Sequence, residues 1–220
     1  MTKLAKINKP APLSTIAYNA LRESILSFHL KQDVIYNEMA VAQELGLSRT
    51  PVREALLKLS SHGLVTFLPR KGFIISSYTL QDVKEIFELR QMVETAVAKK
   101  IAATVAPENL EQLNVYISIQ YKAAANKDYH RFMYSDRDFH NYFFQLADNK
   151  RLLAIANNFQ DLCHLMGASA LKSGDRYDCV IQEHEAIVKA LEGGNASQVE
   201  GAVSEHLALV QKVVEVNLNI

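Results

Sequence analysis

The sequence has few cysteines and few glycines, and it lacks any long apolar segment. Its two cysteines, Cys163 and Cys179, fit neither a disulfide framework nor a metal-binding pair, so we expect inert thiols in a reducing compartment. No apolar run approaches the ~18 residues that a membrane-spanning helix needs. The first residues also lack the apolar core of a secretory signal. We therefore expect a cytoplasmic protein with no membrane partner.

The motifs of several enzyme classes are missing as well. The eight glycines form no phosphate-cradling loop, and no serine or cysteine nucleophile motif is found. What the chain does have is an apolar fraction of 49%, which is ample for a core. Its length of 220 residues suits one or two modest domains.

Charge is balanced over the whole chain but not along it. Residues 1–75 contain ten Lys or Arg against five Asp or Glu, an excess of five positive charges that the remaining residues cancel. This distribution suggests an anionic partner for the first third alone.

The first third of the sequence predicts a winged helix-turn-helix. Apolar residues recur at helical spacing over residues 14–28, a second short helix is expected over 37–45, and a third ends before 62–63. Two β-branched and aromatic runs, 64–68 and 73–76, flank a Pro-Arg-Lys-Gly turn and predict a β-hairpin with a basic tip. Such a domain lays the start of its third helix in the DNA major groove, with the hairpin against the backbone or minor groove.

Two arginines at the start of the third helix support DNA binding. Arg49 and Arg53 lie one turn apart, beside Ser48 or Thr50 as the capping residue, although the helix dipole disfavours cations there. The apolar face of this helix is directed inward, so the arginines point to solvent or to a ligand. Phosphates and guanine edges attract both guanidinium groups. Taken alone, the helix could also be an ordinary capped surface helix.

The last two-thirds of the sequence predict an all-α domain. Helices are expected at about 79–104, 107–126, 128–147, 149–171, 177–192 and 196–217, with no strand-like alternation between them. The expected fold class is mainly α, a winged helix-turn-helix followed by a bundle of about six helices. We divide the chain into a flexible tail at 1–11, a DNA-binding domain at 12–78 and a helical domain at 79–220.

Four side chains of the helical domain form a candidate metal site. Asp136 and His140 are four residues apart and share a helix face. His184 and His206 lie 10 and 12 residues from Gly194, on either side of a turn, so an antiparallel helix pair places them at nearly the same height. An Asp/His/His/His set suits a divalent transition metal and leaves positions for water or a ligand. Each histidine could equally be an ordinary surface or core residue.

Two sets of motifs resemble a known family. SRTPVREAL at residues 48–56, GLV at 63–65 and RKGF at 70–73 resemble the GntR family of bacterial regulators. From residue 79 onward the sequence resembles the FCD effector domain of the FadR subfamily, and the matching residues are Arg90, Glu94, the run DRDFH at 136–140, Glu183-His184 and Glu205-His206. The resemblance covers the chain from about residue 13 to the end.

The resemblance implies roles for particular residues. The residues expected at DNA are Ser48, Arg49, Thr50, Arg53, Arg70, Lys71 and Gly72. Of these, Arg49 and Arg53 would contact bases, and the hairpin tip would meet the minor groove. A divalent ion, Zn2+ or else Ni2+ or Mn2+, would be held by Asp136, His140, His184 and His206. A small carboxylate effector would fill the open positions of the metal and pair with Arg90.

The sequence departs from the family pattern at two places. The family loop Gly-x-Leu-x-Pro-Gly reads FHLKQD at residues 28–33, and Met39 occupies a position that is commonly arginine. The first departure affects a loop, whereas the second removes a contact with DNA.

We therefore expect a transcription regulator rather than an enzyme, with operator binding controlled by a small organic acid. A homodimer on a short palindromic site in double-stranded DNA is expected, because one winged helix covers too few base pairs. The alternative is a metal-dependent hydrolase or lyase fused to a nucleic-acid-binding module, since an open metal site can activate water. Against it, Val188 stands where a zincin helix needs its second histidine. A third interpretation is a structural metal that only braces the bundle.

Overall fold

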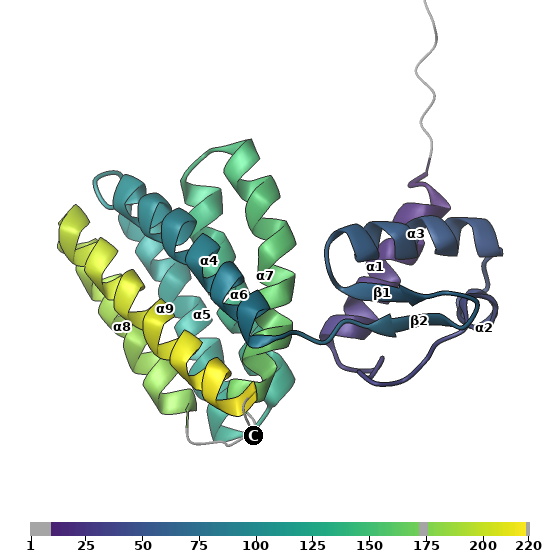
Figure 1. The fold of residues 1–220 in the computed structure, drawn as a ribbon. Coiled ribbons are helices and arrows are strands. Elements are labelled where there is room, and N and C mark those ends of the chain that lie inside the picture. The colour runs from purple at the N-terminus through teal and green to yellow at the C-terminus, as the bar shows by residue number, and fades with distance from the viewer. Residues whose placement is uncertain (1–9, 172–175, 219–220) are drawn as a thin grey trace, which may run out of the picture. The chain divides into compact units, whose positions relative to one another are not determined.

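The computed structural model describes residues 10–171 and 176–218, which form two compact units with their boundary along the chain between Ser77 and Tyr78 (Figure 1). The predicted flexible tail at 1–11 lies outside the described residues, apart from residues 10 and 11.

The N-terminal unit is the predicted winged helix-turn-helix. It contains α1 (Leu13–Leu26), α2 (Glu38–Glu44) and α3 (Arg49–Ser61), followed by the strands β1 (Val65–Leu68) and β2 (Gly72–Ile75). The two strands pair antiparallel, with Val65 opposite Ile75 and Leu68 opposite Gly72. The backbone of Tyr36 extends this hairpin, because its N–H and C=O both bond Phe73.

Local sequence signals account for these helices. Asn37 caps α2, since its Oδ1 accepts the backbone N–H groups of Met39 and Ala40. Gly46, with φ of 65°, ends α2 in the left-handed conformation that glycine adopts without strain. Ser48 occupies the N-cap position of α3, but its side chain makes no capping hydrogen bond within the described chain. The apolar face of α3 packs against α1 and is fully buried at Val52, Leu56 and Leu59.

The C-terminal unit is helical throughout its described residues, as predicted. Its helices are α4 (Leu80–Ile101), α5 (Pro107–Ala125), α6 (Tyr129–Leu146), α7 (Lys150–Leu171), α8 (Tyr177–Glu192) and α9 (Ala196–Leu218). A capping box between Thr79 and Asp82 starts α4, and Pro107 starts α5. Helices α4 and α9 lie side by side, and α5 packs against both α6 and α8 (Figure 1).

The core of the helical unit lies between these helices. Its largest fully buried side chains include Phe132, Phe139 and Phe144, which all come from α6. Helix α6 therefore contributes much of this core, and its buried polar residues Ser135, His140 and Asn141 lie among apolar neighbours. Over residues 10–171 and 176–218, no helix has the length and apolar character needed to cross a membrane.

Candidate metal centre and nucleic-acid interface

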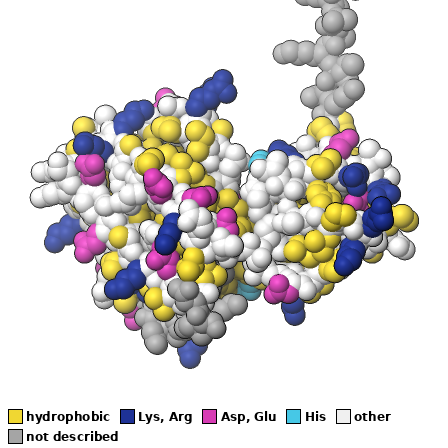
Figure 2. All heavy atoms as spheres, in the orientation of Figure 1, with side chains coloured by type: hydrophobic (Ala, Val, Ile, Leu, Met, Phe, Trp, Pro, Cys, Tyr) yellow, Lys and Arg dark blue, Asp and Glu magenta, His cyan; other side chains and the backbone are white. Residues whose placement is uncertain are grey.

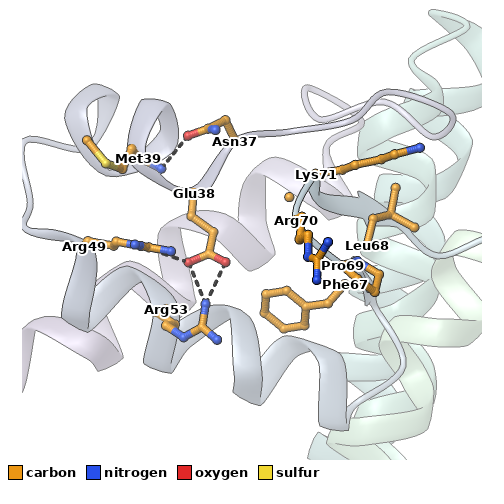
Figure 3. A pocket seen from close by; sticks show the side chains of 11 residues that line it. Asn37, Glu38, Met39, Arg49, Arg53, Phe67, Leu68, Pro69, Arg70 and Lys71 are labelled. Atoms are coloured by element: carbon orange, nitrogen blue, oxygen red, sulfur yellow. Dashed lines mark hydrogen bonds and ion pairs between the residues drawn. The ribbon is translucent and has the colours of Figure 1, made fainter.

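A basic groove lies between α2, the start of α3 and the hairpin of the N-terminal unit (Figure 3). The residues that line it are Asn37, Glu38, Met39, Arg49, Arg53, Phe67, Leu68, Pro69, Arg70, Lys71 and Gly72. Figure 2 shows Lys and Arg side chains gathered over this end of the unit. Of the residues predicted at DNA, five therefore share one surface: Arg49, Arg53, Arg70, Lys71 and Gly72. Thr50 lines an adjoining groove with Arg49 and Arg53, and Ser48 occupies the N-cap position of the same helix.

Glu38 holds both arginines of α3, a partner that the sequence analysis missed. Nη1 of Arg53 donates to the two carboxylate oxygens of Glu38 at 2.8 and 3.0 Å, and Nε of Arg49 donates at 3.3 Å (Figure 3). The side chains of Arg49 and Arg53 remain 58% and 51% exposed, against 11% for Glu38. One acid at the base of the groove thus orients two exposed guanidinium groups. Their remaining N–H donors stay available to phosphates or base edges.

Three histidines converge inside the helical unit. His140 comes from α6, His184 from α8 and His206 from α9, and each is at most 3% exposed. One ring nitrogen from each lies within 4.8 Å of the others, which is the arrangement of a metal-binding group. The Nε2 atoms of His140 and His206 are 3.2 Å apart. Two nitrogens bound to one tetrahedral Zn2+ at ~2.0–2.1 Å are separated by about this distance.

The outer nitrogen of each histidine is held by an oxygen of another side chain. Nδ1 of His140 lies 2.8 Å from Glu94 Oε2, and Nδ1 of His206 lies 2.8 Å from Glu183 Oε2. Nδ1 of His184 lies 2.9 Å from the amide oxygen of Gln120. These contacts place the proton on Nδ1 and turn the lone pair of Nε2 toward the cluster, which is how proteins prepare histidine for a metal.

The buried Nε2 of His184 is the clearest sign that the cluster fits a cation. No hydrogen-bond partner for it exists within the described chain, and leaving such an atom unpaired is costly. Burial, followed by the neighbouring histidines, holds the pKa values of His184 and His206 well below their usual range. Both imidazoles are therefore neutral near pH 7, the protonation state that binds metal.

Asp136 lies at the edge of the histidine cluster rather than inside it. Its Oδ1 is 3.7 Å from Nε2 of His184, and its side chain is 25% exposed. Burial raises the pKa of Asp136, while His140 and Arg90 oppose this shift. The structure thus brings the three predicted histidines together and places the fourth predicted ligand next to them.

Arg90 lines a small pocket beside Asp136. The pocket is formed by Arg90, Met133, Asp136, Arg137, Gln160, Cys163, His164, Gly167, Arg176, Val180 and Val210. Nε of Arg90 donates to Glu94 Oε1 at 2.7 Å, and the pair is almost fully buried. Burial disfavours the charged form of both groups. The attraction between them nevertheless raises the pKa of Arg90, and the attraction of Arg90 and His140 for the carboxylate lowers the pKa of Glu94. A buried guanidinium group facing a pocket is a typical site for a carboxylate.

Four polar residues of the helical unit's site were not given roles by the sequence analysis. Glu94 is four residues after Arg90, a helical spacing that suggests an ion pair, and Glu183 is adjacent to His184. Both signals were available in the sequence. Gln120 and Arg176 gave none, because their partners lie on other turns or helices and only the packing of α5, α8 and α9 brings them to the histidines.

Comparisons with known proteins agree with both halves of this description. Residues 13–75 match the family model for bacterial regulatory proteins of the gntR family, and residues 85–209 match the model for the FCD domain. The transcriptional repressor RspR of Escherichia coli is 25% identical over 214 residues, which cover 97% of this chain and 94% of the repressor.

A second relative and a solved structure extend the comparison. The gluconate operon repressor of Bacillus licheniformis is 24% identical over 200 residues, covering 89% of this chain and 82% of the repressor. The structure of E. coli McbR/YncC has a TM-score of 0.82 and 19% identity, covering 93% of this chain and 98% of that one. This last likeness concerns the fold alone.

Proposed function

We propose a function from one premise: the chain belongs to the GntR family of bacterial regulatory proteins and carries an FCD domain. It is a transcription regulator whose winged helix-turn-helix binds DNA. Beyond this, we infer that a small carboxylate effector, bound at a metal site in the helical domain, controls its binding to the operator.

The basic groove of the N-terminal unit supports the assignment of DNA-reading residues. Arg49 and Arg53 present half-exposed guanidinium groups at the start of α3, and Arg70 and Lys71 face the same groove from the hairpin. In this proposal the two α3 arginines contact base edges, while the hairpin cations contact the backbone. Ser48, Thr50 and Gly72 complete the surface.

The convergence of one ring nitrogen from each of three histidines is the observation that carries the metal proposal. His140, His184 and His206 would hold the ion, with Asp136 as the fourth ligand from the edge of the cluster. Nitrogen ligands with one carboxylate suit Zn2+, and also Ni2+ or Mn2+. When bound, such an ion supplies a positive charge that attracts an anion.

The protein's own residues would then select and hold a carboxylate. Arg90 faces the pocket beside Asp136, and Glu94 fixes the orientation of its guanidinium group. The name of the B. licheniformis relative ties that protein to the operon of gluconate, a sugar carboxylate. By analogy, a small organic acid is the class of effector that we assign to this chain.

Control of DNA binding would come from the position of the site between helices. The cluster joins α6, α8 and α9, so an effector bound there can change how these helices pack. A coupling free energy of ~1–3 kcal/mol changes affinity about 5- to 150-fold. We further propose that the helical domain forms a homodimer, which would bind a palindromic operator.

The enzyme interpretation is not favoured, because both family matches belong to transcription regulators and span most of the chain. The structural-metal interpretation is separated from effector control by experiment. A purely structural metal would contribute to stability, and addition of an organic acid would then leave the affinity for DNA unchanged.

The test compares the purified wild-type protein with the double variant His184→Ala/His206→Ala. We expect about one equivalent of bound metal in the wild type and none in the variant. A chelator should lower the melting temperature of the wild type alone and abolish release of the operator by organic acids. His130→Ala, a change to an exposed histidine of α6 outside the cluster, serves as the matched control. Equal metal content in wild type and double variant would refute the site.

A further inference from the structure

Two glutamates beside the cluster each contact an arginine and a histidine at the same time. Oε1 of Glu94 accepts from Arg90 at 2.7 Å, while its Oε2 accepts from Nδ1 of His140 at 2.8 Å. Glu183 repeats the arrangement: Nη2 of Arg176 lies 2.9 Å from Oε1, and Nδ1 of His206 lies 2.8 Å from Oε2. We call Arg90–Glu94–His140 and Arg176–Glu183–His206 the two relays.

The relays start at the same pocket and end at the same cluster. Arg90 and Arg176 both line the pocket beside Asp136, although Arg90 belongs to α4 and Arg176 directly precedes α8. Their guanidinium groups are thus placed to meet one bound anion. The third histidine, His184, is held at Nδ1 by the neutral amide of Gln120, and among the described residues no carboxylate takes that place. His184 is therefore an internal control for effects that act through the two glutamates.

We propose that Glu94 and Glu183 couple the pocket arginines to the metal-binding histidines, and that Arg176 joins Arg90 in binding the anion. This rests on the proposed metal site and effector. It adds a mechanism by which occupation of the pocket alters the affinity of the cluster for metal, without direct contact between the anion and the histidines.

The coupling follows from the sharing of one carboxylate between two donors. In the absence of an anion, the charge of Glu183 is divided between the guanidinium group of Arg176 and the Nδ1–H of His206. An anion that engages Arg176 weakens its hold on Glu183. The hydrogen bond from His206 then strengthens, and Nε2 becomes a better ligand. By linkage, a bound metal must raise the affinity of the pocket for the anion by the same factor.

A double-mutant cycle on the second relay tests this without knowledge of the effector. The dissociation constant of Zn2+ is measured for the full chain as wild type, Arg176→Gln, Glu183→Gln and the double variant. Loss of the carboxylate in Glu183→Gln should weaken Zn2+ binding ~10- to 100-fold. Arg176→Gln, which mimics neutralisation by an anion, should tighten it.

The cycle separates the relay from ordinary charge repulsion. Removal of a positive charge near a metal tightens binding in any background, whereas the relay acts only through Glu183. We therefore expect the effect of Arg176→Gln to be larger by about threefold or more when Glu183 is present. The matched control is Glu205→Gln, which removes an exposed acid adjacent to His206 in sequence and should leave Zn2+ binding near the wild-type value.

A second measurement stands even if Glu183→Gln does not fold. In the Zn2+-loaded protein, the Nδ1–H proton resonance of His206 should move downfield in Arg176→Gln, and that of His184 should not move. Suppose that the wild type binds Zn2+ but Arg176→Gln has an equal effect with and without Glu183, or that the His206 resonance does not shift. Either result would overturn the relays and leave the metal site standing. Failure of the wild type to bind Zn2+ would overturn both.

Discussion

Arg53 is the single residue on which reading of the operator should depend most. It lies one turn after the first residue of α3 with half of its side chain exposed, and its second Nη group is not engaged by Glu38. Arg53→Ala should cost ~1–3 kcal/mol of affinity for the specific operator and relax specificity at one position. Lys71→Ala should instead weaken binding to all sequences alike. It should also reduce, by about one, the slope of the logarithm of the binding constant against the logarithm of the salt concentration. Titrations of both variants on operator and scrambled DNA distinguish the two roles; unchanged operator affinity of Arg53→Ala would show that α3 is not the recognition helix.

Glu38 should control the balance between specific and non-specific binding. Its carboxylate opposes the charge of Arg49 and Arg53 and reduces their attraction for any phosphate. Glu38→Gln should therefore bind scrambled DNA more tightly, while its preference for the operator falls. Because both arginines are exposed, the change should alter stability by less than ~1 kcal/mol. The ratio of the two affinities at fixed salt is the measurement, and a ratio equal to that of the wild type would exclude this role.

The histidine cluster should make the metal-free protein sensitive to mild acid. The pKa values of His184 and His206 are depressed by burial in the folded protein, so the unfolded chain takes up protons that the folded chain does not. Their contribution to stability is then lost as pH falls below ~6.5 and is constant above it. The raised pKa values of Asp136 and Glu183 act in the opposite direction.

The variant His184→Gln separates the contribution of this histidine to the acid sensitivity from that of the carboxylates. Chelator-treated wild type should lose more stability than His184→Gln between about pH 7 and 5.5, as measured by urea unfolding at each pH. Parallel pH profiles of the two proteins would show that His184 does not titrate in this way.

Among the elements, the hairpin depends on one glycine. Gly72 begins β2 with φ of 129°, and an added Cβ would lie 2.1 Å from the carbonyl oxygen of Tyr36. Gly72→Ala should therefore destabilise the N-terminal unit by roughly 2–4 kcal/mol, from backbone strain and overpacking together. Gly201→Ala in α9 is the control, since nothing lies within 4 Å of its added Cβ and the helix should gain ~0.5–1 kcal/mol. Thermal unfolding followed by circular dichroism measures both; a Gly72→Ala protein as stable as wild type would contradict the strain.

The sequence predicted the elements well, because their signals are local. Periodicity, the Thr79 capping box and the stops at Gly46 and Gly194 fix helices within a few residues. Some helix ends were misplaced by a few residues. The first helix ends at Leu26, because Phe28 adopts φ of 58° and cannot continue it, and α4 ends at Ile101 rather than near residue 104.

Contacts between elements were predicted less completely. The meeting of three histidines agrees with the expectation from helix height, since His184 and His206 lie level across one hairpin. By contrast, the pair Arg53–Glu38 joins residues 15 apart, and His184–Gln120 joins residues 64 apart. No periodicity encodes such pairs, because they arise only when separate helices pack.

For the whole molecule, we expect a homodimer in solution. The helical unit exposes large apolar side chains on its surface, among them Met92 on α4 (63% exposed) and Val216 on α9 (54% exposed). Burial of such side chains in a symmetric interface would stabilise association. Sedimentation equilibrium at micromolar concentration should give twice the mass of the 24.7 kDa chain. A monomer both with and without operator DNA would exclude the dimer and the palindromic site that follows from it.

The acid at the base of the basic groove would also affect how long a search for the operator takes. A regulator must sample a very large number of wrong sites before it reaches the right one, and its dwell time at each is set by attraction to the phosphate backbone. If Arg49 and Arg53 contact base edges as proposed, their hydrogen bonds to Glu38 would shield them at other sequences and would shorten each stop along the chromosome. On this proposal, one carboxylate would lower the affinity for wrong sites and so shorten the time needed to reach the operator.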